Sequence, residues 1–278
     1  MDIFQGIIIG IVQGLTEFLP VSSSAHLVFI QHILGVESSL AFDTFLHLGT
    51  LIAVIWFFRY DIIKMISAWI LSIQDIIRGR FKEGFYSDPY KRLAWYVILA
   101  TIPVGIVGLF FEDAIDELFF SGGLYVPAFF LFVTGTILYL SQRMASGRVN
   151  MNNISKKEAI WMGLGQACAI LPGLSRSGTT IAAGLTIGLD KEFAAKFSFI
   201  LAIPAIFGAF IVQVSDIGSA LDVNFLPVIL GFIASVIAGY MAIKWMLDLI
   251  KNRSLDIFAF YCWIVGIVVF IGSVAHIF

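Results

Sequence analysis

Long stretches without charged side chains recur along this chain, and they restrict it to folds that sit in lipid. Hydrophobic residues make up 59% of its 278 residues and charged residues 13%, against roughly 25% in ordinary globular domains. A helix needs about 20 apolar residues to cross the hydrocarbon of a bilayer. We therefore predict an all-α integral membrane protein whose transmembrane helices lie in six stretches: 41–58, 93–111, 118–142, 197–215, 223–243 and 257–278.

Two further apolar segments are too short to cross a bilayer and are interrupted by polar residues. The first runs over residues 3–16, meets Pro20 and three successive serines, and continues over 27–36. The second follows the same plan within about 157–189. Non-helical backbone at membrane depth is tolerated where protein buries it or where it lines a wet cavity. We therefore predict two re-entrant pairs of broken helices, at about 3–36 and about 157–189.

The two halves of the chain repeat each other. The spacing from Pro20 to Phe45 equals that from Pro172 to Phe197, and Gly10-x-x-Gln13 is matched by Gly163-x-x-Gln166. One re-entrant pair and three spans make an odd number of crossings, so the second copy must be inverted, as in many transporters. We predict repeats at 1–150 and 151–278 within one membrane domain. The stretch 61–77 is charged and amphipathic, and we expect it partly at the interface.

Basic residues indicate the orientation. With the N-terminus outside, the loops at 59–92, 143–157, 191–196 and 244–253 all face the cytoplasm. These loops carry 16 of the 17 lysines and arginines, and the acidic turns predicted at 112–117 and 216–222 then face outside. The remaining basic residue, Arg176, lies in the second broken pair. The net charge of −2 argues against a nucleic-acid partner.

Ionisable side chains in the two breaks are candidates for a functional site, because hydrocarbon makes them costly. Gln13 and Glu17 are four residues apart, hence on one face of a helix. Ser22, Ser23 or Ser24 could cap one helix, and Ser175 could cap another that starts near Arg176. Their N-termini would present free N–H groups and a guanidinium to a phosphate-like anion. Glu17 would repel that anion unless a hard cation, Mg²⁺ or Ca²⁺, lay between them.

Other residues have competing interpretations. His26 follows Ser22 and Ser23 by one helical turn and could reach a serine hydroxyl or a leaving oxygen. Helix capping alone would explain Ser22 and Ser24. A buried structural ion pair would explain Glu17 and Arg176, although such pairs are costly to bury. We expect packing or interfacial roles for the solitary histidines and small buried side chains for the two cysteines: His32, His47, His276, Cys168 and Cys262.

The two breaks resemble the motifs of a known family, the bacterial undecaprenyl-diphosphate phosphatases linked to bacitracin resistance. The matching stretches are Gln13-x-x-x-Glu17-Phe-Leu-Pro-Val-Ser-Ser and Leu-Pro172-Gly-Leu-Ser175-Arg176-Ser177-Gly-x-Thr180. The resemblance covers nearly the whole chain. It implies hydrolysis of undecaprenyl diphosphate to undecaprenyl phosphate and phosphate, which recycles the lipid carrier of peptidoglycan synthesis. The family has Glu or Gln at the position of Gln13, so a second carboxylate is not obligatory there.

The resemblance also implies the roles of individual residues. Its catalytic positions map onto Glu17, Ser23, His26 and Arg176, with Glu17 also the candidate metal ligand. The supporting positions, taken with the break serines, give a substrate-binding set of Gln13, Ser22, Ser24, Ser175, Ser177 and Thr180. Both a serine nucleophile and a metal-activated water fit these residues.

The expected partners are the prenyl diphosphate and the lipid bilayer. The resemblance places the chain in the bacterial cytoplasmic membrane as a multi-pass protein, with a site open to the extracytoplasmic side. The oligomeric state stays open, a homodimer included. A transporter or flippase of a polyprenyl phosphate is the alternative, because it would use the same inverted repeat and anion site without bond cleavage.

Overall fold

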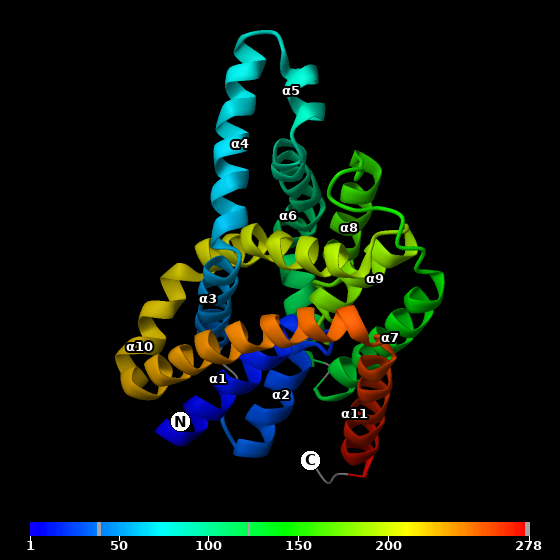
Figure 1. The fold of residues 1–278 in the computed structure, drawn as a ribbon. Coiled ribbons are helices and arrows are strands. Elements are labelled where there is room, and N and C mark those ends of the chain that lie inside the picture. Colours follow the sequence, from blue (N-terminus) through cyan, green and yellow to red (C-terminus); the bar gives the residue numbers. More distant parts are fainter. Residues whose placement is uncertain (38–39, 122, 276–278) are drawn as a thin grey trace.

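The computed structural model describes the backbone of residues 1–37, 40–121 and 123–275, and the side chains of 1–37, 41–111, 123–212 and 225–275. Within these ranges the chain is helical, and no strand is formed (Figure 1). The helices are α1 (Ile3–Phe18), α2 (Ser23–Leu34), α3 (Leu40–Phe57), α4 (Arg59–Ile77), α5 (Phe81–Ser87), α6 (Pro89–Ser121), α7 (Tyr125–Met144), α8 (Lys156–Cys168), α9 (Arg176–Thr186), α10 (Lys191–Asn252) and α11 (Asp256–Val274).

Both predicted breaks between short helices are present. Helices α1 and α2 pack against each other across a break at residues 19–22, and α8 and α9 do so across 169–175. Ser22 caps α2 in a backbone conformation with φ +67°, and its hydroxyl accepts a hydrogen bond from the N–H of Ala25 at 3.3 Å. Ser175 caps α9 by accepting from the N–H of Gly178 at 3.0 Å. Each second helix therefore starts at a defined residue inside the fold.

Among the described residues, five helical segments are long and apolar enough to cross a membrane: Pro89–Phe111, Tyr125–Met144, Lys191–Val212, Phe225–Asn252 and Asp256–Val274. A sixth candidate is the pair Ala41–Phe57 and Arg59–Ile77, whose axes differ by 79°. Figure 1 shows α4 extending away from the other helices, with α5 beside it. The described part of the chain thus contains five or six apolar spans, as a multi-pass membrane protein does.

The predicted acidic turns were wrong in their local structure. Residues 112–117 continue α6, which ends at Ser121, so the next span begins at Tyr125 rather than at 118. The reason is that this acidic stretch contains no glycine or proline; beyond the helix, Gly123 adopts φ +49°, a conformation that glycine allows readily. Residues 216–222 likewise lie within α10, which curves and returns alongside its own first half (Figure 1).

Glycines set the closest contacts between helices. Helix α1 packs on the second half of α10, where a Cβ added to Gly10 would lie 2.8 Å from the Cα of Gly231. Helix α8 packs on α6, where a Cβ added to Gly163 would lie 2.8 Å from the Cα of Ala100. Such close backbone approach is typical of helix packing in membranes, where small residues occupy the interfaces.

The contact between α7 and α11 is reciprocal. A Cβ at Gly135 of α7 would lie 2.7 Å from the carbonyl oxygen of Ala259 in α11. A Cβ at Gly266 of α11 would lie 3.0 Å from the carbonyl oxygen of Ala128 in α7. Position numbers rise along one helix as they fall along the other, so the two helices run antiparallel.

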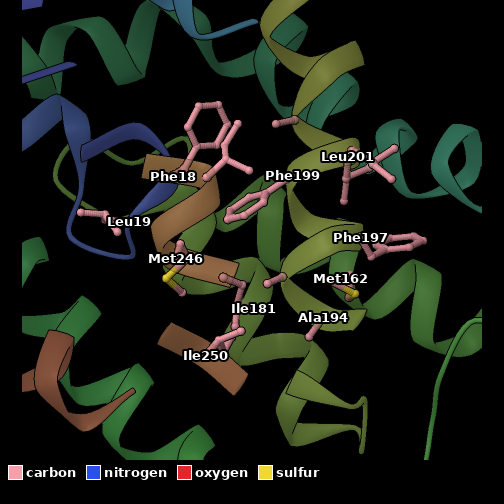
Figure 2. Close-up of a cluster of buried hydrophobic side chains, with 14 of the residues drawn as sticks. Phe18, Leu19, Met162, Ile181, Ala194, Phe197, Phe199, Leu201, Met246 and Ile250 are labelled. Carbon is pink, nitrogen blue, oxygen red and sulfur yellow. The ribbon is translucent and has the colours of Figure 1, made fainter. Parts of the chain in front are cut away.

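The main hydrophobic core lies beside the first break. Figure 2 shows Phe18 of α1 close to Phe199 of α10, and their ring centroids are 5.3 Å apart in an edge-to-face contact. Ile181 of α9 and Met246 of α10 are fully buried in the same cluster. This cluster holds the end of α1 against α9 and α10. Of the two cysteines, Cys262 is buried as expected, whereas Cys168 is exposed, contrary to the sequence prediction.

Candidate active site

Glu17 is the centre of a polar cluster drawn from both breaks. Its Oε1 atom accepts a hydrogen bond from Nη2 of Arg176 at 2.6 Å, which closes an ion pair between α1 and α9. Its Oε2 atom accepts from the Ser23 hydroxyl at 2.6 Å and from Nε2 of Gln13 at 2.9 Å. The side chain of Glu17 is 3% exposed and that of Arg176 is 17% exposed. The structure thus brings together four residues that the sequence assigned to one site.

Local helix geometry places these groups. Gln13 and Glu17 lie one turn apart on α1, so their side chains meet on one face. Pro20 then stops the helix, because its ring removes a donor and clashes with the preceding turn. Ser23 is the first residue of α2 and Arg176 the first residue of α9. The two helix N-termini with their partial positive charge therefore begin at the site.

Direct hydrogen bonds connect the two breaks. The hydroxyl of Ser177 donates to the carbonyl of Leu19 at 3.0 Å, and the N–H of Gly173 donates to the Ser24 hydroxyl at 3.2 Å. The hydroxyls of Ser175 and Ser177 lie 3.3 Å apart. These bonds fix α9 against the end of α1, which sets the distance between Arg176 and Glu17.

The remaining predicted binding residues are held by protein groups. Ser22 caps α2, as the capping interpretation expected, and its hydroxyl lies 3.2 Å from that of Ser24. Thr180 donates to the carbonyl of Arg176 at 2.7 Å and also contacts the Ser198 hydroxyl. Thr180 therefore lies behind the backbone that carries the guanidinium.

The ring of His26 does not contact a serine hydroxyl. Its Nδ1 lies 2.8 Å from the backbone carbonyl oxygen of Ser22, and its Nε2 lies 2.8 Å from the hydroxyl of Tyr261 in α11. The predicted reach from His26 to Ser23 is thus absent from this arrangement, in which Ser23 is bonded to Glu17 instead. Tyr261 comes from the opposite end of the chain, and nothing in the sequence pattern pointed to it.

His47 belongs to the polar cluster, contrary to the expectation of a packing or interfacial role. Its Nε2 lies 3.4 Å from Oε2 of Glu17, and its Nδ1 lies 2.7 Å from the carbonyl oxygen of Asp43. The carbonyl only accepts, so Nδ1 carries a hydrogen, and the contact with the carboxylate is attractive when Nε2 carries one as well. Asp43 and His47 lie four residues apart inside one apolar span, and that pairing was the available signal. Of the other histidines, His32 is exposed, and His276 lies outside the described residues.

The polar cluster around Glu17 offers few possible ligands to a divalent cation. Among the described residues no group of three or more His, Cys, Asp or Glu side chains could hold a metal. One acceptor is nevertheless left over, because Oε1 of Gln13 is buried without a hydrogen-bond partner beside Glu17. Mg²⁺ typically takes one or two protein oxygens and completes its shell with water and substrate phosphates. The residues present fit such an ion.

Comparison with known proteins decides the family. The family model described as "Bacitracin resistance protein BacA" matches residues 6–268. The chain belongs to this family. It is 75% identical to the undecaprenyl-diphosphatase of Methanobrevibacter smithii over 100% of both chains. It is also 50% identical to that of Methanosphaera stadtmanae and 39% identical to that of Carboxydothermus hydrogenoformans, each over 99% of both chains.

Membership in the BacA family confirms the resemblance drawn from the two breaks. The matched region begins before Gln13 and ends after Tyr261, so every residue of the cluster lies inside it. The relatives match over nearly their full length, so no large part of the family fold falls outside the alignment. The polar cluster around Glu17 is therefore the candidate site for the family's chemistry.

Proposed function

We propose that this chain is an undecaprenyl-diphosphatase, which releases the terminal phosphate of undecaprenyl diphosphate and returns the monophosphate lipid carrier. Its relatives in the family bear that name over nearly their whole length. The observation that supports the chemistry is the pair of contacts on Glu17. One carboxylate oxygen holds a hydroxyl, and the other holds a guanidinium from the second break. A nucleophile, a base and an anion-binding group therefore meet at one buried point.

In the first step we assign Ser23 as the nucleophile. Its hydroxyl already donates to Glu17 at 2.6 Å, so Glu17 is placed to accept the proton as the oxygen attacks. The new bond joins Ser23 Oγ to the terminal phosphorus. The bond from that phosphorus to the bridging oxygen breaks, and undecaprenyl phosphate leaves with the bridging oxygen. The product on the protein is a phosphoserine.

Arg176 stabilises the charge that builds up on the phosphoryl oxygens. Its Nη2 is paired with Glu17, whereas its Nη1 is buried and has no hydrogen-bond partner within the described residues. A guanidinium can donate from both nitrogens to an anion, and pre-placed donors of this kind lower the barrier most. The unpaired nitrogen is the one we assign to substrate.

Water completes the reaction. It attacks the phosphoserine, the bond from phosphorus to Ser23 Oγ breaks, and protonated Glu17 returns its proton to that oxygen. We assign the proton lost by water to His26, whose Nε2 faces the Tyr261 hydroxyl, because Nε2 of the other histidine, His47, is turned toward Glu17. Glu17 and Oε1 of Gln13 would hold a divalent cation, Mg²⁺ or Ca²⁺, which would neutralise phosphate charge when bound. Ser22, Ser24, Ser175, Ser177 and Thr180 hold the backbone of the two breaks and the first turns of α2 and α9 around the phosphates.

The same proposal includes an inverted repeat with halves at 1–150 and 151–278. Two sets of helix contacts support it. Ala259 and Gly266 lie 131 positions after Ala128 and Gly135, and each glycine contacts the alanine of the other helix. A two-fold axis in the membrane plane produces such an exchange between antiparallel helices.

In the second set of contacts, Gly10 packs on Gly231, and its repeat partner Gly163 packs on Ala100. Ala100 lies 131 positions before Gly231, the same offset as in the first set. The first helix of each half thus packs on the matching helix of the other half. With the basic loops in the cytoplasm, we place both termini and the site opening on the extracytoplasmic side of the cytoplasmic membrane.

Phosphate release by the purified protein from a long-chain prenyl diphosphate tests the function. We expect turnover in the wild type, loss of turnover in Glu17→Gln, and normal turnover in Glu192→Gln. Glu192 is a matched control because it pairs with Lys196 at 2.7 Å on α10, outside the cluster. If the protein in vesicles moves a prenyl phosphate across the bilayer but releases no phosphate, the transporter alternative replaces this proposal.

A further inference from the structure

Both nitrogens of the His26 ring are engaged, which fixes the ring and its tautomer. The Ser22 carbonyl, 2.8 Å from Nδ1, can only accept a hydrogen bond, so Nδ1 carries the hydrogen. In the neutral ring Nε2 therefore carries the lone pair, and this is the atom that can act as a base. The group 2.8 Å from that nitrogen is the hydroxyl of Tyr261, which must be the donor.

Tyr261 is held in register with the first break by its neighbour in the chain. The Cys262 thiol lies 3.6 Å from the carbonyl oxygen of Pro20, and the Cys262 side chain is fully buried. The Tyr261 ring stacks on His26 with centroids 5.7 Å apart and planes 10° apart. Its own side chain stays 42% exposed. The hydroxyl of this partly exposed residue thus lies against Nε2 of a fixed imidazole.

We propose that Tyr261 is a further catalytic residue, whose hydroxyl carries the proton between the attacking water and Nε2 of His26. This inference rests on the proposed function. The observation behind it is that the His26 ring makes no hydrogen bond to Ser23, whereas Nε2, the nitrogen that must receive the proton, lies 2.8 Å from the Tyr261 hydroxyl. A tyrosine hydroxyl both donates and accepts, so it can pass a proton without moving its oxygen.

The proton transfer balances with the second step of the reaction. The water oxygen forms its bond to phosphorus while its proton moves to Oη of Tyr261. The hydrogen already on Oη moves to Nε2, leaving a neutral tyrosine and a protonated His26. Ser23 Oγ departs from phosphorus and takes the proton held by Glu17. His26 then returns its proton to solvent through the same hydroxyl.

The ordinary alternative is that the ring stack only packs α2 against α11. Tyr261→Phe separates the two interpretations, because phenylalanine keeps the stack and removes the hydroxyl. If the hydroxyl carries the proton, kcat falls about tenfold or more while KM stays within about twofold, since loss of a positioned acid or base costs roughly 10²–10⁴ and water can partly replace the hydroxyl. If the ring only packs, Tyr261→Phe behaves as the wild type.

Tyr125→Phe is the matched control. Tyr125 is also 42% exposed, and its hydroxyl donates to the Ser273 carbonyl of the same helix α11 at 3.2 Å. Its ring meets Phe270 edge to face with centroids 5.8 Å apart. Removing this hydroxyl should leave kcat unchanged. If kcat of Tyr125→Phe falls as much as kcat of Tyr261→Phe, the effect is a general one on α11, and the proposal is overturned.

A double-mutant cycle tests the coupling directly. His26→Gln and Tyr261→Phe should each slow turnover, and the double variant should be no slower than His26→Gln alone. Both single variants should also accumulate radiolabelled phosphoenzyme during turnover, because the step they share is its hydrolysis. Additive losses in the cycle, or a kcat for Tyr261→Phe equal to or above the wild type, would overturn the relay. Wild-type turnover, measured in the same series, tests the proposed function separately.

Discussion

Replacing Arg176 with lysine tests whether the site needs a guanidinium or only a positive charge. In the structure Nη2 is bonded to Glu17 at 2.6 Å, and Nη1 is buried without a partner among the described residues. A lysine ammonium is a single point charge, so it can serve Glu17 or the phosphate but cannot span both as the planar fork does. Removing one pre-placed donor from a developing oxyanion costs about 10²–10³ in rate, or about 2.7–4 kcal/mol. We expect Arg176→Lys to lose that much in kcat.

The free energy of unfolding of the Arg176 variants separates a loss of catalysis from simple misfolding. Arg176→Ala leaves the carboxylate of Glu17, 3% exposed, without its cation, and such a loss costs about 3–5 kcal/mol in the free energy of unfolding. Arg176→Lys keeps a charge opposite Glu17 and should unfold near the wild-type temperature. The matched control is Arg143→Lys, whose 2.9 Å pair with Asp256 is 46% exposed on the arginine side and should be nearly neutral in both assays.

The assay is phosphate release from a prenyl diphosphate by purified variants, paired with thermal unfolding in the same detergent. If Arg176→Lys releases little phosphate but unfolds near the wild-type temperature, the result supports the role of Arg176 in binding the phosphoryl oxygens. If Arg176→Lys keeps kcat within about threefold of the wild type, the 17% exposed arginine serves as a structural partner of Glu17, and the reasoning about its second nitrogen is wrong.

Three further outcomes are expected. Ser23→Ala should bind substrate but lose nearly all turnover, and retention of more than about a tenth, a barrier change under about 1.4 kcal/mol, would mean that water rather than Ser23 attacks phosphorus. A chelator should abolish wild-type turnover, and full activity in excess chelator would remove the cation from the mechanism. In a chain lacking native cysteines, an impermeant thiol reagent applied outside should label a cysteine at Glu37 and not one at Glu83, and the reverse pattern would invert the topology.

Packing at the glycine contacts gives a prediction that does not depend on activity. Gly10→Ala should lower the free energy of unfolding by about 1–3 kcal/mol, because its new Cβ would overlap the backbone of Gly231 and the helices would have to move apart. Gly105→Ala is the control, since a Cβ there has nothing within 4 Å and alanine favours the helix. Equal stability of the two variants, measured by thermal unfolding, would contradict the close packing of α1 on α10.

Much of the fold was predictable because its determinants are local. Pro20 and the serines after it stop one helix and start the next, and the chain follows that pattern in both halves. The C-terminal end of α6 was not predictable from charge, because acidic residues do not break a helix. The two spans within α10 were predicted, whereas the helical backbone that joins them was not.

The residues of the site also fall into those that the sequence predicted and those that it did not. Gln13 and Glu17 share a helix face, and Ser23 and Arg176 begin the helices after the breaks, so their spacing predicted that they belong to one site. His47 and Tyr261 are brought in by helix packing alone. His47 shares its apolar span with Asp43, a spacing that was visible in the sequence, but Glu17, which it contacts, lies 30 positions away. Tyr261 lies 235 positions from His26, so this contact could be found only after the helices had been placed.

The two breaks share a backbone plan but differ in chemistry, and in our proposal that difference gives one active centre instead of two. Ser175 occupies the position of Ser23, counted from the matching prolines, yet its hydroxyl accepts the N–H of Gly178 and caps α9. Arg176 occupies the position of Ser24. In the mechanism that we propose, the first break supplies the nucleophile and base and the second supplies the cation, so the charge of the substrate is matched only where the two breaks meet.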